Sequence, residues 1–146
     1  MKSTESEINA DLSGEYSALF NAARDARLNA VSTYSGFQVG AAVESETGEI
    51  FSGCNIENAT FGLTVCAERV AVWKALSEGH RKFRRVLVIA DTGTPTPPCG
   101  ACRQILWEFT GNSEVLLADL EGIRAKYKML DLMPQPFDGG FFSAPD

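Results

Sequence analysis

The sequence has no long hydrophobic run and relatively few positive charges. No stretch of its 146 residues approaches the ~20 apolar residues of a membrane span, which argues against a membrane protein. The opening stretch MKSTESEINADLSGEY is polar and acidic and has no apolar segment of the kind a signal peptide carries, so we expect a cytoplasmic protein. Acidic residues outnumber basic ones by 19 to 13. This excess of negative charge argues against polymeric nucleic acid as a partner.

The composition is otherwise that of a folded protein. Apolar residues make up 45% of the chain and charged residues 22%, close to ordinary globular usage. The length suits one domain with a real hydrophobic core. We therefore expect a single domain over residues 1–146, with flexible ends at about 1–11 and 139–146.

Hydrophobic patterning predicts alternating helices and strands. Apolar residues recur at helical spacing near the N-terminus, short apolar runs bounded by Gly and Pro read as strands, and glycines end two helical segments. The expected elements are helices at 12–30, 66–78 and 99–111 and strands at 37–45, 50–55, 86–91 and 114–119. Two successive strand-helix alternations imply parallel strands with helices on both faces. The fold class is therefore α/β, a three-layer α/β/α sandwich around a mixed sheet.

The four cysteines indicate a metal site. In a secreted chain Cys54, Cys66, Cys99 and Cys102 could form two disulfides, but without a signal peptide a metal-binding role is favoured. Cys99 and Cys102 stand at i and i+3 in the first turn of one predicted helix, and Cys66 begins another. The positive N-terminal ends of helices favour thiolates, and adjacent strand-helix units bring such ends to one sheet edge. Three thiolates could meet there around a divalent cation.

A glutamate follows the first of these cysteines closely. Three protein ligands leave one position of a tetrahedral zinc ion open for water, which is typical of catalytic sites. Glu68 is rotated about 200° from Cys66 around the helix, so it can face that water as a general base and acid. A redox pair or a structural zinc half-site is the alternative for the CxxC. Redox use would not explain Glu68. The candidates for a fourth ligand are weak: Cys54 lies at the end of a strand, and His80 follows a helix in a turn where we expect it to be exposed. We expect Trp73 and Trp107 to be packing residues.

The motifs CAER and PCGACRQ together resemble those of the zinc-dependent cytidine deaminases, in particular the small homotetrameric type with three cysteine ligands. The resemblance runs from about Ala23 to Phe137 and includes YSGFQVGAAV, GCNIEN, GLTVCAER, ALSEG and LDLMPQPF. It implies a cytidine deaminase-like fold with a mixed five-stranded sheet. It also implies hydrolytic deamination of cytidine or deoxycytidine in pyrimidine salvage.

The resemblance assigns roles at the metal centre. Cys66, Cys99 and Cys102 would hold one Zn²⁺ per chain. Glu68 would carry a proton from water to N3 of the pyrimidine and then to the leaving ammonia. Arg69 and Arg103 would donate hydrogen bonds to the thiolates, so that three negative ligands do not overcompensate the +2 ion.

The resemblance also assigns substrate contacts. Asn55 and Glu57 would bind the ribose 3'-hydroxyl, and Phe37 would pack on the pyrimidine. The backbone of Ala67 and the Pro97-Pro98 loop would read the polar edge of the base.

Two aromatic positions bear on assembly. Phe61 stands where the family often has a tyrosine that lines a neighbouring subunit's pocket, so one hydroxyl contact near the sugar is missing. Phe137 matches an aromatic residue that enters a neighbour's site, which implies a homotetramer with shared sites. Two other functions stay open: a deaminase of a modified or antibiotic aminopyrimidine nucleoside, and a catalytically silent zinc-binding module.

Overall fold

A five-stranded mixed sheet forms the centre of the molecule. The computed structural model describes residues 14–142. The strands are β1 (Val39–Ser45), β2 (Ile50–Cys54), β3 (Phe83–Ala90), β4 (Glu114–Ala118) and β5 (Ile123–Lys128), and they lie in the order β2-β1-β3-β4-β5. β3 and β4 pair in parallel, while the other three neighbouring pairs are antiparallel. The mixed five-stranded sheet is thus confirmed.

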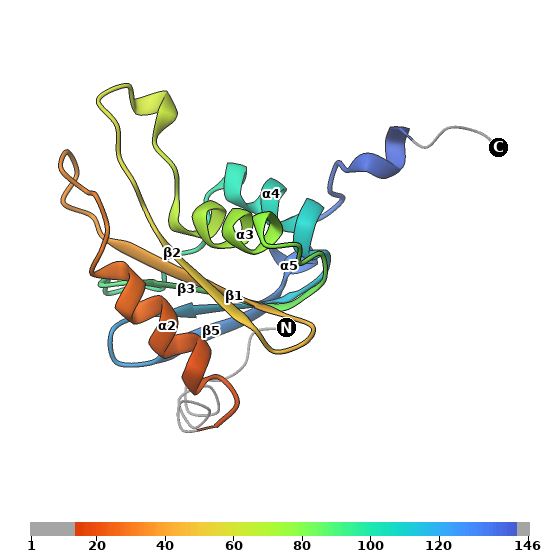
Figure 1. Cartoon of the computed structure of the whole chain (residues 1–146), viewed down its shortest axis with the longest axis horizontal. Helices are drawn as coiled ribbons and strands as arrows, with labels where there is room; N and C mark the ends of the chain where they lie inside the picture. Colours follow the sequence, from red (N-terminus) through yellow and green to blue (C-terminus); the bar gives the residue numbers. More distant parts are fainter. Residues whose placement is uncertain (1–13, 143–146) are drawn as a thin grey trace.

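Helices cover both faces of this sheet. Helix α2 (Ser17–Arg27) lies on one face, and α3 (Ala67–Ser77) and α4 (Gly100–Thr110) lie on the other (Figure 1). One core cluster joins Tyr16, Leu19 and Phe20 to the sheet, and a second packs residues such as Val72 and Leu106 against the opposite face. Burial on both faces explains why β3 ends in a continuous apolar run. The α/β/α sandwich predicted from the sequence is confirmed.

Several elements differ from the sequence prediction. The first helix spans Ser17–Arg27 rather than 12–30, and residues 12 and 13 lie outside the described range. Strand β5, helix α5 (Met129–Leu132) and the 3₁₀ turns η2 (Phe61–Leu63) and η3 (Gly139–Phe142) were not located from the sequence. Of the flexible ends expected at 1–11 and 139–146, residues 1–11 and 143–146 lie outside the described residues, whereas residues 139–142 form η3. Within residues 14–142 no helix combines the length and apolar character needed to cross a membrane.

A close approach between β2 and α3 sets the position of the cysteine at the start of that helix. Gly53 lies against the first turns of α3, where a Cβ atom would be 2.6 Å from the backbone nitrogen of Ala71 and 2.8 Å from the oxygen of Ala67. Such distances exclude any side chain, so glycine is required for this helix to pack so tightly on the sheet. The packing brings Cys66, just before α3, close to the end of β2.

Candidate active site

Three cysteines meet at the starts of α3 and α4. Cys66 and Cys99 are the N-cap residues of these helices, and Cys102 lies in the first turn of α4. Their three sulfur atoms lie within 4.8 Å of one another, with 3.9 Å between Cys66 Sγ and Cys99 Sγ. Zinc-sulfur bonds of about 2.3 Å place tetrahedral ligands about 3.8 Å apart. The type and spacing of these donors therefore fit zinc.

Hydrogen bonds concentrate negative charge on one of these sulfurs. The Cys102 thiol and Arg69 both donate toward Cys66 and lower the pKa of the Cys66 thiol to about 5. Arg69 Nη2 lies 3.3 Å from Cys66 Sγ. The bond to Cys66 and burial raise the pKa of Cys102 in turn. A thiolate is thus available at neutral pH, beside a guanidinium that balances its charge.

The two weak candidates for a fourth ligand lie outside the cluster. Cys54 is half-buried at the end of β2, where burial raises the pKa of its thiol. His80 is half-buried rather than exposed as expected: its Nε2 lies 3.0 Å from Glu49 Oε2 and its ring packs on Phe51. Among the described residues, the cluster of potential metal ligands comprises Cys66, Cys99 and Cys102 alone.

A buried carboxylate faces the same space as the cysteines. Glu68, the second residue of α3, has 4% of its surface exposed. It lines a cavity of about 190 Å³ together with Cys66 and Cys99, and we call this space the inner cavity. Desolvation raises the pKa of Glu68 to about 7. A carboxyl group with such a pKa can both accept and release a proton at neutral pH.

Further residues of the inner cavity come from the segments just before β1 and just after β2, from the start of α3 and from the loop before α4. Phe37, Asn55, Ala67 and Pro97 all line it. Asn55 accepts a hydrogen bond from Val39 N at 2.8 Å and donates one to the Phe37 carbonyl at 2.7 Å. Its amide therefore fixes the chain that carries Phe37 and keeps one N–H free for a ligand.

A second hollow adjoins the first. This outer cavity, of about 370 Å³, is lined by Tyr34, Ser35, Glu57, Phe61 and Thr64, and it shares Thr64 with the inner cavity. Hydrogen bonds from the Ser35 side chain and from the backbone of Ser35 and Tyr34 lower the pKa of Glu57. Phe61 is 73% exposed and meets Tyr34 edge to face at 5.8 Å. Ser35, which lies in the motif YSGF, and Thr64 were not predicted from the sequence to be site residues.

Arg103 and Phe137 lie apart from both cavities. Arg103 donates to the carbonyl oxygens of Pro98 and Leu132, each at 2.8 Å, and so ties α4 to the preceding loop and to α5. Phe137 is 54% exposed and stacks with Phe141 in the C-terminal segment, which projects from the body in Figure 1. The structure therefore brings the cysteines, Glu68 and Arg69 together, whereas Phe137 and Arg103, which follows Cys102 in the chain, line neither cavity.

Comparison with known families agrees with this arrangement. Residues 14–118 match the family model of the cytidine and deoxycytidylate deaminase zinc-binding region. The chain belongs to this family. The match includes all three clustered cysteines and Glu68.

Two cytidine deaminases match over nearly their whole length, and a blasticidin-S deaminase matches over about three quarters of its length. The cytidine deaminase of Halalkalibacterium halodurans is 45% identical over 129 residues, which cover 88% of this chain and 94% of the relative. The crystal structure of cytidine deaminase from Burkholderia pseudomallei superposes with a TM-score of 0.80 at 42% identity, over 84% of this chain and 99% of that one. A blasticidin-S deaminase of Bacillus cereus is 31% identical over 66% of this chain and 74% of its own length. The fold and the zinc-dependent deaminase class predicted from the sequence are confirmed.

Proposed function

We propose that this protein hydrolyses cytidine and deoxycytidine to uridine or deoxyuridine and ammonia, as a step of pyrimidine salvage. One observation carries the proposal: Glu68 lines the same cavity of about 190 Å³ as Cys66 and Cys99 of the cysteine cluster, and this cavity has room for a pyrimidine ring. The names of the relatives at 45% and 42% identity support the same substrate class. The net reaction adds water at C4 and breaks the bond from C4 to the exocyclic nitrogen, with no change of oxidation state.

Cys66, Cys99 and Cys102 would hold one zinc ion per chain. When bound, this metal supplies a hydroxide nucleophile at neutral pH. Glu68 accepts the proton that the attacking water loses and delivers it to N3 of the pyrimidine. The carboxylate then takes the proton of the hydroxyl that has been added at C4 and gives it to the departing amino group, so that this group leaves as ammonia and a C4 carbonyl forms. Burial of Glu68 away from bulk water keeps this proton between the carboxyl and the substrate.

The other cavity residues orient the substrate. Phe37 packs on the face of the pyrimidine, and the backbone of Ala67 and the Pro97-Pro98 loop bind its polar edge. Asn55 and Glu57 bind the ribose 3'-hydroxyl, Asn55 through its remaining amide N–H. Support comes from position, because Phe37, Asn55, Ala67 and Pro97 line the inner cavity and Glu57 lines the adjoining outer cavity.

The two arginines serve different parts of the site. Arg69 offsets the charge of the thiolates through its bond to Cys66. For Arg103 we also propose a thiolate contact, made through the guanidinium N–H groups that its bonds to Pro98 and Leu132 leave free. These two carbonyl bonds hold the loop before α4 in place beside Cys99.

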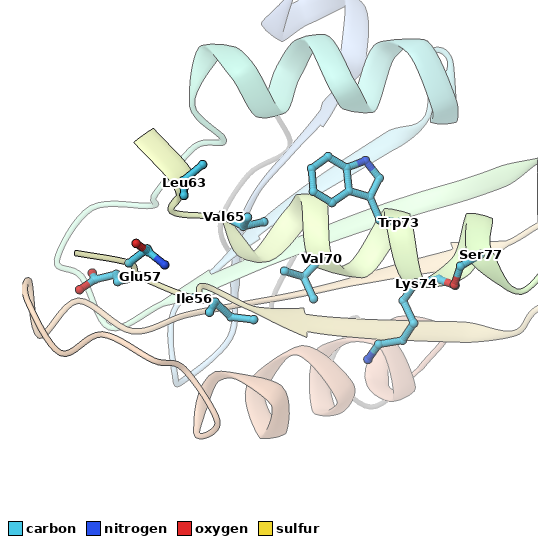
Figure 2. Close-up of a pocket in the computed structure, with 9 residues that line it drawn as sticks. Ile56, Glu57, Leu63, Val65, Val70, Trp73, Lys74 and Ser77 are labelled. Carbon is cyan, nitrogen blue, oxygen red and sulfur yellow. The ribbon is translucent and has the colours of Figure 1, made fainter. Parts of the chain in front are cut away.

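The active unit is proposed to be a homotetramer. A groove of about 430 Å³ runs along the outer side of α3 and presents apolar side chains, with Trp73 42% exposed (Figure 2). We call it the α3 groove; it is lined by Ile56, Glu57, Asn58, Leu63, Val65, Val70, Trp73, Lys74 and Ser77. Because Glu57 lines both this groove and the outer cavity, a second copy seated on α3 would also wall the site. Phe61 and Phe137, both exposed, would reach into the neighbour's site.

The cysteine ligands bear on where the protein is located. Thiolate ligands stay available for zinc in a reducing compartment, which supports the cytoplasm as the location.

The likeness to a blasticidin-S deaminase favours a second candidate, deamination of an aminopyrimidine antibiotic. Intact Asn55 and Glu57 favour an ordinary nucleoside over this candidate.

Absorbance assays on a panel of substrates test the proposal. The zinc-loaded protein is given cytidine, deoxycytidine, cytidine 5'-monophosphate, free cytosine and blasticidin S at equal concentrations. We expect turnover of the two nucleosides and little of the nucleotide, because the carboxylate of Glu57 lines the outer cavity and repels a phosphate. Preferred turnover of blasticidin S would support the alternative, and no turnover of any compound would support a silent zinc module.

A further inference from the structure

Ser35 occupies a bridging position between the two parts of the substrate site. Its hydroxyl donates a hydrogen bond to Glu57 Oε2 and accepts one from Phe37 N at 3.0 Å. The first bond joins residues 22 positions apart in the sequence, whereas the second closes a local turn. One hydroxyl therefore links the residue proposed to hold the ribose with the residue proposed to pack on the base.

The carboxylate of Glu57 is held from three directions. Oε1 accepts hydrogen bonds from the backbone N–H groups of Tyr34 at 2.8 Å and Ser35 at 3.1 Å, and Oε2 accepts the bond from the Ser35 hydroxyl. A carboxylate has about four acceptor positions, two on each oxygen. The three bonds leave one position on Oε2, so the Ser35 hydroxyl decides in which direction that last acceptor points.

We infer that Ser35 is a positioning residue for sugar recognition: its hydroxyl fixes the free acceptor of Glu57 toward the ligand's 3'-hydroxyl and ties it to Phe37. This inference rests on the proposed function. The two backbone donors to Oε1 remain in any Ser35 variant, so the carboxylate stays in place but rotates more freely about its terminal bond. Side-chain freedom that must be lost on binding weakens the bond to the sugar.

Substrate truncation separates this role from a general structural one. Cytidine offers a 3'-hydroxyl to Glu57, whereas 2',3'-dideoxycytidine does not. Replacing Ser35 by Ala should lower kcat/KM for cytidine about tenfold, the usual effect of losing one hydrogen bond to a charged group. The same variant should change kcat/KM for 2',3'-dideoxycytidine less than twofold. A loosened fold would slow both substrates equally.

Matched variants complete the experiment. Ser35→Thr keeps the hydroxyl and should retain most of the cytidine activity. Thr47→Ala removes a hydroxyl that bonds Ser45 in the β1-β2 turn, at the opposite end of the strands, and should leave both substrates unaffected. Glu57→Ala alone should lower kcat/KM for cytidine about tenfold to a hundredfold. Adding Ser35→Ala to that variant should have little further effect on kcat/KM.

The outcomes distinguish this inference from the proposed function. Wild-type activity on cytidine with an unchanged Ser35→Ala variant would overturn the role of Ser35 and leave the deaminase assignment standing. Equal losses on cytidine and on 2',3'-dideoxycytidine would also overturn it, since they would indicate a structural effect. Absence of wild-type activity on every cytosine nucleoside would instead refute the proposed function.

Discussion

Arg69 donates a hydrogen bond from Nη2 to the sulfur of Cys66, 3.3 Å away, across the first turn of α3. A thiolate relieved of part of its charge donates less to a bound metal, which keeps that metal a stronger Lewis acid. Arg69→Gln should therefore lower kcat about tenfold to a hundredfold without weakening zinc binding. Steady-state kinetics and zinc titration measure the two quantities.

A surface arginine provides the control for that prediction. Arg24 pairs with Asp25 on the exposed side of α2, so Arg24→Gln removes the same charge far from the cysteines. We expect it to match the wild type in both measurements. Equal behaviour of the Arg69 and Arg24 variants would show that the bond to Cys66 has no influence on the metal.

Zinc content should depend on three of the four cysteines. Cys66→Ser, Cys99→Ser and Cys102→Ser each remove one thiolate from the cluster and should purify with much less than one zinc per chain. Cys54→Ser, which alters a half-buried thiol outside the cluster, should keep full zinc. Metal analysis of the four purified proteins checks this. A zinc content of one ion per chain in Cys99→Ser would contradict the ligand assignment.

Mixed assemblies test the shared sites. Chains with Glu68→Gln and chains with Phe137→Ala should each be inactive or impaired alone. If Phe137 acts in a neighbour's site, a mixed tetramer contains sites with both residues intact and regains activity. The activity of co-refolded mixtures, with sedimentation to establish assembly, measures this. A fully active monomer at assay concentration would contradict the model.

The buried Tyr16 should make the stability of the fold depend on pH in alkaline solution. Its ring is 1% exposed and lies near Arg85 and Lys126, at 4.8 and 5.1 Å from the charged groups. Burial, followed by the hydrogen bond with Glu114, raises the pKa of the Tyr16 phenol, and its bond to Tyr16 raises the pKa of Lys126. The pKa values of Tyr16 and Lys126 are therefore higher in the folded protein than in the unfolded chain. The stabilisation that these two groups provide is complete below their pKa values in the unfolded chain, and it is lost as pH rises through their pKa values in the folded protein.

The free energy of unfolding should therefore fall as pH rises above about 10, the value for an unperturbed tyrosine. Tyr16→Phe removes both the phenol and its bond to Lys126, so this variant should show a shallower decline. Urea unfolding of the two proteins between pH 8 and pH 11 makes the comparison. Parallel curves would show that Tyr16 does not govern alkaline stability.

Most of the framework follows from local sequence signals. The apolar run of β3 and the glycines after α3 and α4 predict their elements because burial and helix termination leave strong marks. The sequence signal of β5 is weaker, because Ile123, Ala125 and Tyr127 alternate with basic residues, which is typical of an edge strand. An alternation scan could have found it.

The metal cluster was predictable for a similar reason. Helix starts at Cys66 and Cys99 follow from capping and spacing, and the topology then brings the two helix ends together. The Ser35 contacts were not predictable, because they depend on a loop and a strand end that only the folded chain places side by side. The same holds for Arg103, whose two carbonyl partners lie 5 and 29 residues away.

The central claim is that Glu68 moves the proton in a deamination carried out at the cysteine cluster. Its most direct test is the rate of cytidine deamination by the zinc-loaded Glu68→Gln protein, beside its zinc content and circular dichroism. We predict full zinc and an unchanged fold, because Glu68 is not among the clustered sulfur ligands, with kcat reduced by at least ~10²- to 10⁴-fold. A Glu68→Gln protein that turns over cytidine at a rate near that of the wild type would contradict the account.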